Sequence, residues 1–111
     1  MKTWRTTLGA CLALALAGPA LAQGYPSRPV RVIVPFPPGN AADLTARVLA
    51  EEAQRRLNVS LVVENRAGGS GAIGVQAVTT ARPDGYTLLV SSLSPVVVNP
   101  ALLRNLPYDP V

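Results

Sequence analysis

The chain has 111 residues, of which 49% are hydrophobic and 14% charged, with one Cys, no His and a formal net charge of +4. This length allows one small domain at most, and the apolar composition argues against intrinsic disorder. Because the chain has no His and a single Cys, it lacks the ligands of a structural zinc site and any Ser-His or Cys-His pair. We therefore expect neither a metal nor a cofactor.

The first 22 residues have the pattern of a secretory signal peptide. Lys2 and Arg5 give a positive start, residues 8–17 form an apolar run, and residues 20–22 read Ala-Leu-Ala, which is typical of a cleavage site. The apolar run is shorter than the roughly 20 residues that a membrane span needs. We therefore predict export and cleavage after Ala22.

Removal of this segment leaves 89 residues in which eight Arg face six acidic residues. No basic cluster extends beyond Arg55-Arg56, so the sequence has no electrostatic footprint for nucleic acid. The remaining chain has no Cys and cannot be stabilised by disulfides. We expect a monomer that does not bind nucleic acid.

The first predicted elements are a strand and a helix joined by a proline-rich loop. Residues 30–34 are mostly β-branched and predict a strand, which the prolines of residues 35–38 end by removing backbone donors. Asn40 suits a helix N-cap, and Asp43 lies three positions on, in the place of a capping-box acid. A helix is predicted over residues 41–57. Its expected apolar face consists of Ala46, Leu49, Ala50, Ala53 and Leu57.

The rest of the chain continues this alternation of strands and helices. The pattern predicts a strand at 59–64, a loop at 65–71, a helix at 72–81, a turn at 82–85 and a strand at 86–90. Asn58 suits a left-handed helix stop. After Pro95, residues 96–98 fit either a strand or the start of a short helix, and Asn99-Pro100 predicts a boundary.

The order β-α-β-α-β with nearly continuous apolar strands predicts an α/β fold with a parallel sheet and right-handed crossovers. Such a sheet needs helices on both faces, and two helices cover only part of that surface. We therefore expect residues 23–111 to form the beginning of a larger domain and to be marginally stable alone.

Three loops are candidates for a binding site, because ligands of open α/β sheets bind outside the carboxyl ends of the strands. These loops span residues 35–43, 65–71 and 91–94, and they are rich in Gly, Ser, Asn or Pro. The first two lead into helix N-termini, where unpaired N–H groups favour an anion. The alternative is that tight loops of any α/β protein need Gly and Asn.

Two side chains of the first loop have a similar choice of roles. Asp43 either orients a ligand or caps its own helix. Phe36, which lies between prolines, either lines a pocket wall or plugs the top of the sheet.

Residues 69–74 (GSGAIG) fit the G-x-G-x-x-G pattern of dinucleotide-binding proteins and lie between a strand and a helix. However, the acidic residue expected about 20 positions further on is missing, and the loop is longer than the tight turn of that fold. A small exported nucleotide-binding protein is therefore an alternative hypothesis.

Several motifs identify a resemblance to a known family. They are YPSRPV at 25–30, VPFPPG at 34–39 with Asp43, ENR at 64–66 with the glycines up to Gly74, PDGYTLL at 83–89, and NP at 99–100 with LPYDP at 106–110. In this order they resemble the Bug-type receptors, the periplasmic substrate-binding proteins of tripartite tricarboxylate transporters. The match runs from Tyr25 to Val111.

The resemblance implies a non-catalytic periplasmic receptor with two lobes that close on a small carboxylate. It also implies a partnership with the membrane components of the transporter. Family members hold the ligand largely through backbone amides and bridging waters. Carried over to this sequence, the implied ligand-binding residues are Phe36, Gly39, Asn40, Ala41 and Asp43, supported by Gly69, Ser70, Gly71, Ser91 and Ser92.

The sequence departs from the family pattern in two ways. Asn40 stands where the family has a second glycine after Pro-Pro-Gly. The chain also stops within the first lobe of the implied fold. A truncated product without function is therefore a further alternative to the receptor hypothesis.

Overall fold

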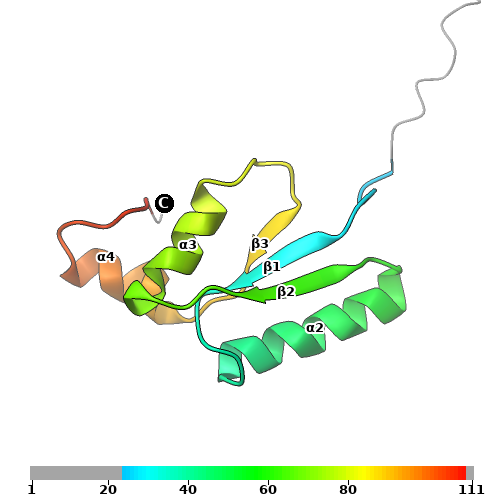
Figure 1. The fold of residues 1–111 in the computed structure, drawn as a ribbon, viewed down its shortest axis with the longest axis horizontal. Helices are drawn as coiled ribbons and strands as arrows, with labels where there is room; N and C mark the ends of the chain where they lie inside the picture. The colour runs from blue at the N-terminus through cyan, green and yellow to red at the C-terminus, as the bar shows by residue number, and fades with distance from the viewer. Residues whose placement is uncertain (1–23, 110–111) are drawn as a thin grey trace, which may run out of the picture.

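The structure, a computed structural model, describes residues 24–109, so the predicted signal peptide lies outside the described residues. Three strands and three α-helices alternate along the chain, with two short helical turns, η1 and η2 (Figure 1). The elements are β1 (Val30–Val34), α2 (Ala41–Leu57), β2 (Leu61–Asn65), η1 (Gly69–Gly71), α3 (Ala72–Thr79), β3 (Thr87–Leu89), η2 (Ser94–Val98) and α4 (Asn99–Leu102).

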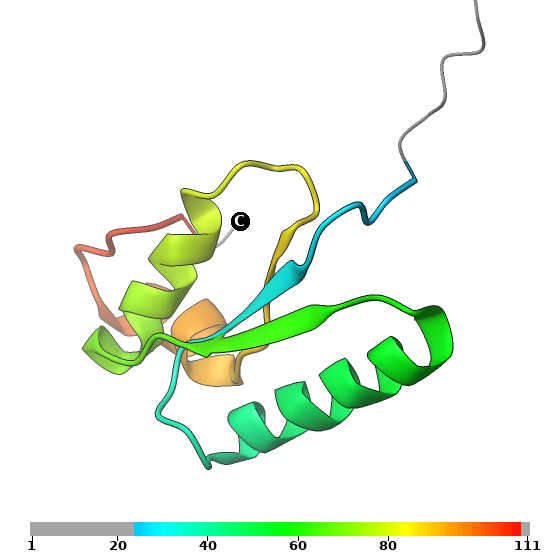
Figure 2. The same ribbon diagram turned by 45° about the vertical axis from the view of Figure 1, so that its right-hand side comes forward.

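The three strands form one parallel sheet in the order β2-β1-β3, which confirms the predicted parallel α/β fold. Val34 at the end of β1 is paired with Asn65 at the end of β2, and Ile33 is paired with Leu89 at the end of β3. The carboxyl ends of all three strands therefore lie at the same edge of the sheet. Figure 2 shows η1 and η2 beyond this edge.

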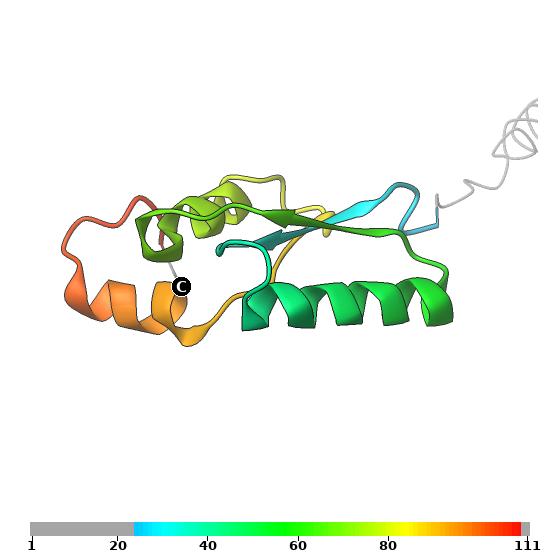
Figure 3. The same ribbon diagram turned by 60° about the horizontal axis from the view of Figure 1, so that its bottom comes forward.

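Helices α2 and α3 cover opposite faces of the sheet (Figure 3). Val32 and Val34 of β1 pack with Ala46 of α2 on one face. On the other face, Ala72 and Val75 of α3 pack with Leu89 of β3. Successive side chains of a β-strand point to opposite faces of the sheet, so β1 supplies core side chains to both layers. It is the most buried of the three strands.

The apolar face predicted for α2 is partly wrong. Ala46 and Ala50 are buried, but Leu49 is 56% and Leu57 is 70% exposed. The sheet beneath α2 has three strands, and α2 contacts only β1 and β2 substantially. The contact is therefore narrower than the stripe of apolar residues on the helix. Asn58 ends α2 at φ 53 and ψ 38, as the left-handed stop predicts.

The segment after Pro95 settles the choice that the sequence left open, because residues 96–98 are helical. At the boundary predicted for Asn99-Pro100, η2 ends and α4 begins, but the helical backbone does not end there. The backbone keeps right-handed helical angles at Leu93 and at Asn99, and α4 follows η2 without a break. Pro100 lies within this continuous helical segment and contributes no N–H group to it.

The end of the described chain folds back onto α3. The side chain of Tyr108 is buried against Ala72 and Val75, and its hydroxyl donates a hydrogen bond to the carbonyl of Pro95. This contact ties the last described residues to η2. Within residues 24–109, no helix has the length and apolar character to cross a membrane.

Candidate ligand-binding site

The three loops predicted from the sequence meet at the carboxyl edge of the sheet. They follow Val34, Asn65 and Leu89, which the strand register places side by side. In the order β2-β1-β3, the second strand of the chain lies on one side of β1 and the third strand lies on the other side. In such sheets, ligands bind at this switch point, here between the ends of β1 and β3.

Gly71 joins the three loops through close packing. A Cβ atom at Gly71 would lie 2.8 Å from Cγ of Pro95 and 3.6 Å from Cβ of Pro35. Both prolines are fully buried. Gly71 also has a φ of +90°, a conformation that L side chains rarely adopt. A glycine at this position is therefore required both for the turn and for the approach of the loops.

The first loop leads into α2 through the predicted N-cap. Asn40 has extended backbone angles, and its side-chain oxygen accepts a hydrogen bond from the N–H of Asp43 at 3.0 Å. The carbonyl of Asn40 accepts from the N–H of Leu44. Within the described residues, the N–H groups of Ala41 and Ala42 donate no hydrogen bond to the protein. These groups, at the positive end of the helix dipole, suit an anionic ligand.

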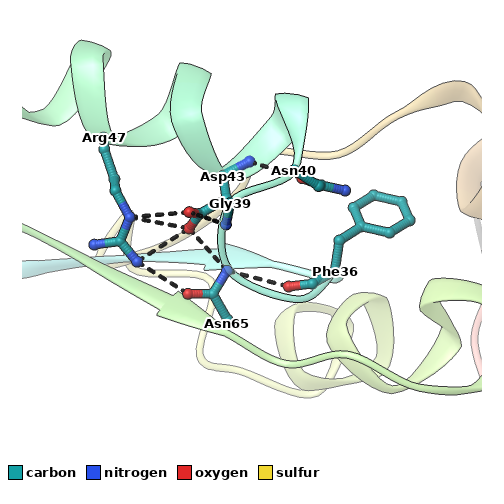
Figure 4. A network of polar contacts seen from close by, with 6 residues as sticks. All are labelled: Phe36, Gly39, Asn40, Asp43, Arg47 and Asn65. Atoms are coloured by element: carbon teal, nitrogen blue, oxygen red, sulfur yellow. Dashed lines mark hydrogen bonds and ion pairs between the residues drawn. The ribbon is translucent and has the colours of Figure 1, made fainter.

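Asp43 is buried and turned toward the loop behind it (Figure 4). Its carboxylate accepts from the N–H of Gly39 at 2.8 Å, from Nδ2 of Asn65 at 2.8 Å and from Nε of Arg47 at 3.1 Å. The capping-box pattern predicted that the carboxylate accepts a hydrogen bond from the N–H of Asn40. It accepts instead from the N–H of Gly39, the residue before the N-cap. Direct contact between Asp43 and a ligand stays a prediction. The burial of its carboxylate disfavours such a contact.

These donors stabilise the charged form of Asp43. The hydrogen bonds from Arg47, Gly39 and Asn65 lower the pKa of Asp43 from 3.8 to about 2. The same carboxylate raises the pKa of Arg47. The ion pair thus stays intact over the pH range in which organic acids are ionised, and it neutralises the negative charge beneath the loop.

Asn65 is the residue that the sequence analysis missed. It is the last residue of β2, and its Nδ2 donates to Asp43 and, at 3.1 Å, to the carbonyl of Phe36. Its Oδ1 accepts from Arg47 at 3.1 Å. Asn is depleted in strands, so its position at the end of a strand, in the ENR motif, is the signal that would have found it.

The second loop uses its glycines for packing. Ser70 has a φ of 54°, and its carbonyl accepts from the buried side chain of Asn99 at 3.0 Å. A Cβ atom at Gly74 would lie 2.5 Å from Cβ of Pro35. The G-x-G-x-x-G pattern at residues 69–74 therefore has a structural cause in the contacts of Gly71 and Gly74 with prolines. The side chain of Ser70 is exposed at the rim.

The third loop begins where the N–H of Val90 donates to the carbonyl of Ile33 at 3.0 Å. The next two residues, Ser91 and Ser92, are half-buried and exposed, and the hydroxyl of Ser91 donates to the carbonyl of Ser92 at 3.3 Å. The structure thus brings the residues predicted for the site to one edge, on three different loops.

Two open hollows lie along α2, away from the three loops. One open hollow lies on the outer side of α2 between Leu44 and Leu49, and another lies between α2 and β2 beside Gln54. Residues 24–109 contain no group of three or more Asp, Glu, Cys or His side chains that could hold a metal ion.

The comparison with known proteins identifies the family. Residues 45–111 match the model of the tripartite tricarboxylate transporter family receptor. The chain belongs to this family, which confirms the resemblance seen in the motifs.

One curated relative is the protein BugT of Bordetella pertussis. It is 49% identical over 94 residues, which cover 84% of this chain and 29% of BugT. The chain therefore spans less than a third of the length of this relative.

Two solved structures extend the comparison to the fold. The structure of a periplasmic transporter matches this chain with a TM-score of 0.75 and 46% sequence identity. The match covers 79% of this chain and 30% of the transporter chain. MatC from Rhodopseudomonas palustris with bound malate has a TM-score of 0.72 and 36% identity, covering 78% and 29%. The predicted fold class is confirmed: the chain matches part of the first lobe of such proteins.

Proposed function

We propose that this chain forms one wall of a carboxylate-binding site in a periplasmic receptor, which passes an organic acid to the membrane components of a tripartite transporter. The observation that carries this proposal is the meeting of three loops at the switch point. There, Ala41 and Ala42 offer N–H groups that have no acceptor among residues 24–109. The family and the malate bound to MatC support a di- or tricarboxylate.

In this proposal, backbone groups of the first loop bind the ligand. The N–H groups of Ala41 and Ala42 donate to a carboxylate, and the half-buried ring of Phe36 forms an apolar wall. Gly39 and Asn40 give the loop its shape. The residues that line the opposite walls are Gly69, Ser70, Gly71, Ser91 and Ser92. No Lys or Arg is needed, because the helix N-terminus supplies the positive potential.

The proposal extends to the arrangement of the whole protein. Residues 1–22 act as a signal peptide that is cleaved after Ala22, and residues 23–111 contribute to the first of two lobes in a monomeric receptor without catalytic activity. Because the relatives are about three times as long, the facing wall comes from sequence that this chain does not contain. A ligand held between two lobes loses about half of its contacts when one is missing, so this chain alone binds weakly.

An NMR titration tests the proposal at the level of single backbone groups. The ¹⁵N-labelled chain is titrated with malate and with citrate at constant ionic strength, and neutral dimethyl malate serves as the control. We expect the largest shifts at the N–H groups of Ala41 and Ala42, smaller shifts at Ser70 and Ser91, and none with the diester. Shifts centred on the opposite rim, around Asn58 and Gly85, would overturn the proposal. A stronger response of residues 69–74 to a nucleotide would favour the nucleotide-binding alternative.

A further inference from the structure

Two acceptor groups of the first loop, the carbonyl of Phe36 and the carboxylate of Asp43, are satisfied from within the protein. The carbonyl of Phe36 accepts from Asn65, and the carboxylate of Asp43 accepts from Gly39, Asn65 and Arg47. Pro37 and Pro38 contribute no N–H group to the loop. Within the described residues, the N–H groups of Ala41 and Ala42 at the start of α2 have no protein acceptor and are available to a ligand.

Asn65 stands at the centre of this arrangement. Its amide nitrogen has two hydrogens, which go to Phe36 and to Asp43, and its amide oxygen takes a hydrogen from Arg47. It is also the residue that ties the loop after β1 to the end of β2. Of the side chains of this size, only an amide can donate twice and accept at the same time; a carboxylate only accepts and an aliphatic side chain does neither.

We propose that Asn65 is a positioning residue for carboxylate binding: by holding the carbonyl of Phe36 and the carboxylate of Asp43 inward, it keeps acceptors away from the anion. This inference rests on the proposed function. An anion gains from converging N–H groups and loses from any carbonyl or carboxylate oxygen that points toward it. Asn65 therefore acts through the loop and not by touching the ligand.

The test compares two substitutions that break the bridge differently. Asn65→Asp keeps the size and the oxygen that Arg47 contacts, but it replaces both donors with acceptors. Asn65→Ser removes the bridge without adding charge. Malate is the probe, and affinity is measured from the NMR shifts of Ala41 and Ala42 relative to the unmodified chain. We expect both variants to bind about tenfold more weakly near pH 8, as the loss of a charge-assisted or doubly donated contact predicts.

The pH profile separates positioning from a merely structural role. Lowering the pH from about 8 to about 4 protonates a growing share of the introduced carboxyl of Asn65→Asp, whose ordinary pKa is about 3.9 and which faces the Asp43 carboxylate and the Arg47 guanidinium, and so restores one donor. The deficit of Asn65→Asp should shrink over this range, while that of Asn65→Ser should stay constant. Taking the ratio to the unmodified chain at each pH cancels the titration of malate itself.

Gln54→Glu is the matched control, because it adds the same charge on an exposed position of α2. It should bind malate like the unmodified chain. If Asn65→Asp binds normally near pH 8, or if both variants lose the same factor at every pH, the positioning role is wrong and the proposed function stands. If the unmodified chain responds neither to malate nor to citrate at concentrations high enough to detect the weak binding expected of one lobe, the proposed function fails and this inference fails with it.

Discussion

Gly74 of α3 lies directly against Pro35, the residue that follows β1. A Cβ atom at Gly74 would come within 2.5 Å of Cβ and 2.7 Å of Cα of Pro35, and within 2.9 Å of the carbonyl oxygen of Arg66. Two of these three atoms belong to the backbone, which cannot turn aside as a flexible side chain does. The contact fixes the distance between α3 and the carboxyl edge of the sheet, where the first two loops begin.

We expect Gly74→Ala to destabilise the chain by about 1–3 kcal/mol, because the added methyl group overpacks a rigid contact. Urea unfolding followed by circular dichroism measures this loss. Gly24→Ala is the control, since a Cβ atom there meets nothing within 4 Å. An unchanged urea midpoint for Gly74→Ala would show that α3 can move away from Pro35 at little cost.

The ion pair beneath the first loop predicts an acid-sensitive stability. The hydrogen bonds of Arg47, Gly39 and Asn65 hold the pKa of Asp43 at about 2, below its ordinary value of 3.8. A group with a depressed pKa in the folded state stabilises the fold fully above its unfolded pKa, and this contribution is lost as the pH falls. The Asp43 contribution should therefore disappear between about pH 4 and about pH 2.

Asp43→Asn should be less stable than the unmodified chain at pH 7 and should change less on acidification, because an amide presents N–H groups to the donors of Arg47 and Asn65. Urea midpoints at several pH values measure both effects. Glu64→Gln provides the comparison, since Arg31 and Arg66 also lower the pKa of Glu64, but on the opposite face of the sheet. Parallel pH profiles for Asp43→Asn and the unmodified chain would contradict the assignment.

The sequence predicted those features of the fold that depend on neighbouring residues. The strand at residues 30–34, the N-cap Asn40 and the left-handed Asn58 follow from local propensity and capping chemistry, and the structure confirms them. The three loops were placed correctly because parallel strands end at one edge. These predictions needed only the element order and the residue types.

The features that the sequence could not predict depend on contacts between distant residues. Asn65 reaches Phe36, which is 29 positions away in the chain, and Tyr108 reaches Pro95 from a segment without regular structure. The exposure of Leu49 likewise follows from the narrow sheet under α2 and not from the helix periodicity. Long-range partners of this kind are set by tertiary packing, which overrides local pattern.

Asn99 gives a prediction for the second loop. Its buried side chain donates to the carbonyl of Ser70 at 3.0 Å, and it joins α4 to the left-handed turn of η1. Asn99→Ala should cost about 1–2 kcal/mol, because the carbonyl of Ser70 loses its donor in a partly buried place. Hydrogen exchange at Gly71 and Ala72 should accelerate as well. Asn105→Ala is the control at an exposed Asn, and an equal effect of both substitutions would contradict the role of Asn99.

The proposed anion site can be probed by removing a single N–H group. Ala41 is the first residue of α2, and proline is well tolerated at the first helical position. A proline also requires the preceding residue to be extended, and Asn40 already has φ −81° and ψ 171°. Ala41→Pro should therefore leave the urea midpoint nearly unchanged while it removes one donor to the carboxylate.

We expect Ala41→Pro to weaken malate binding by about five- to tenfold, the effect of losing one hydrogen bond to a charged group. The NMR shifts of Ser70 and Ser91 measure the affinity, since the altered residue has no N–H group of its own. Ala41→Gly keeps the N–H group and should bind malate normally, although glycine weakens the helix more than proline does at this position. If instead Ala41→Gly loses as much affinity as Ala41→Pro, the loss comes from a disturbed helix start, and the N–H group of Ala41 does not bind the carboxylate.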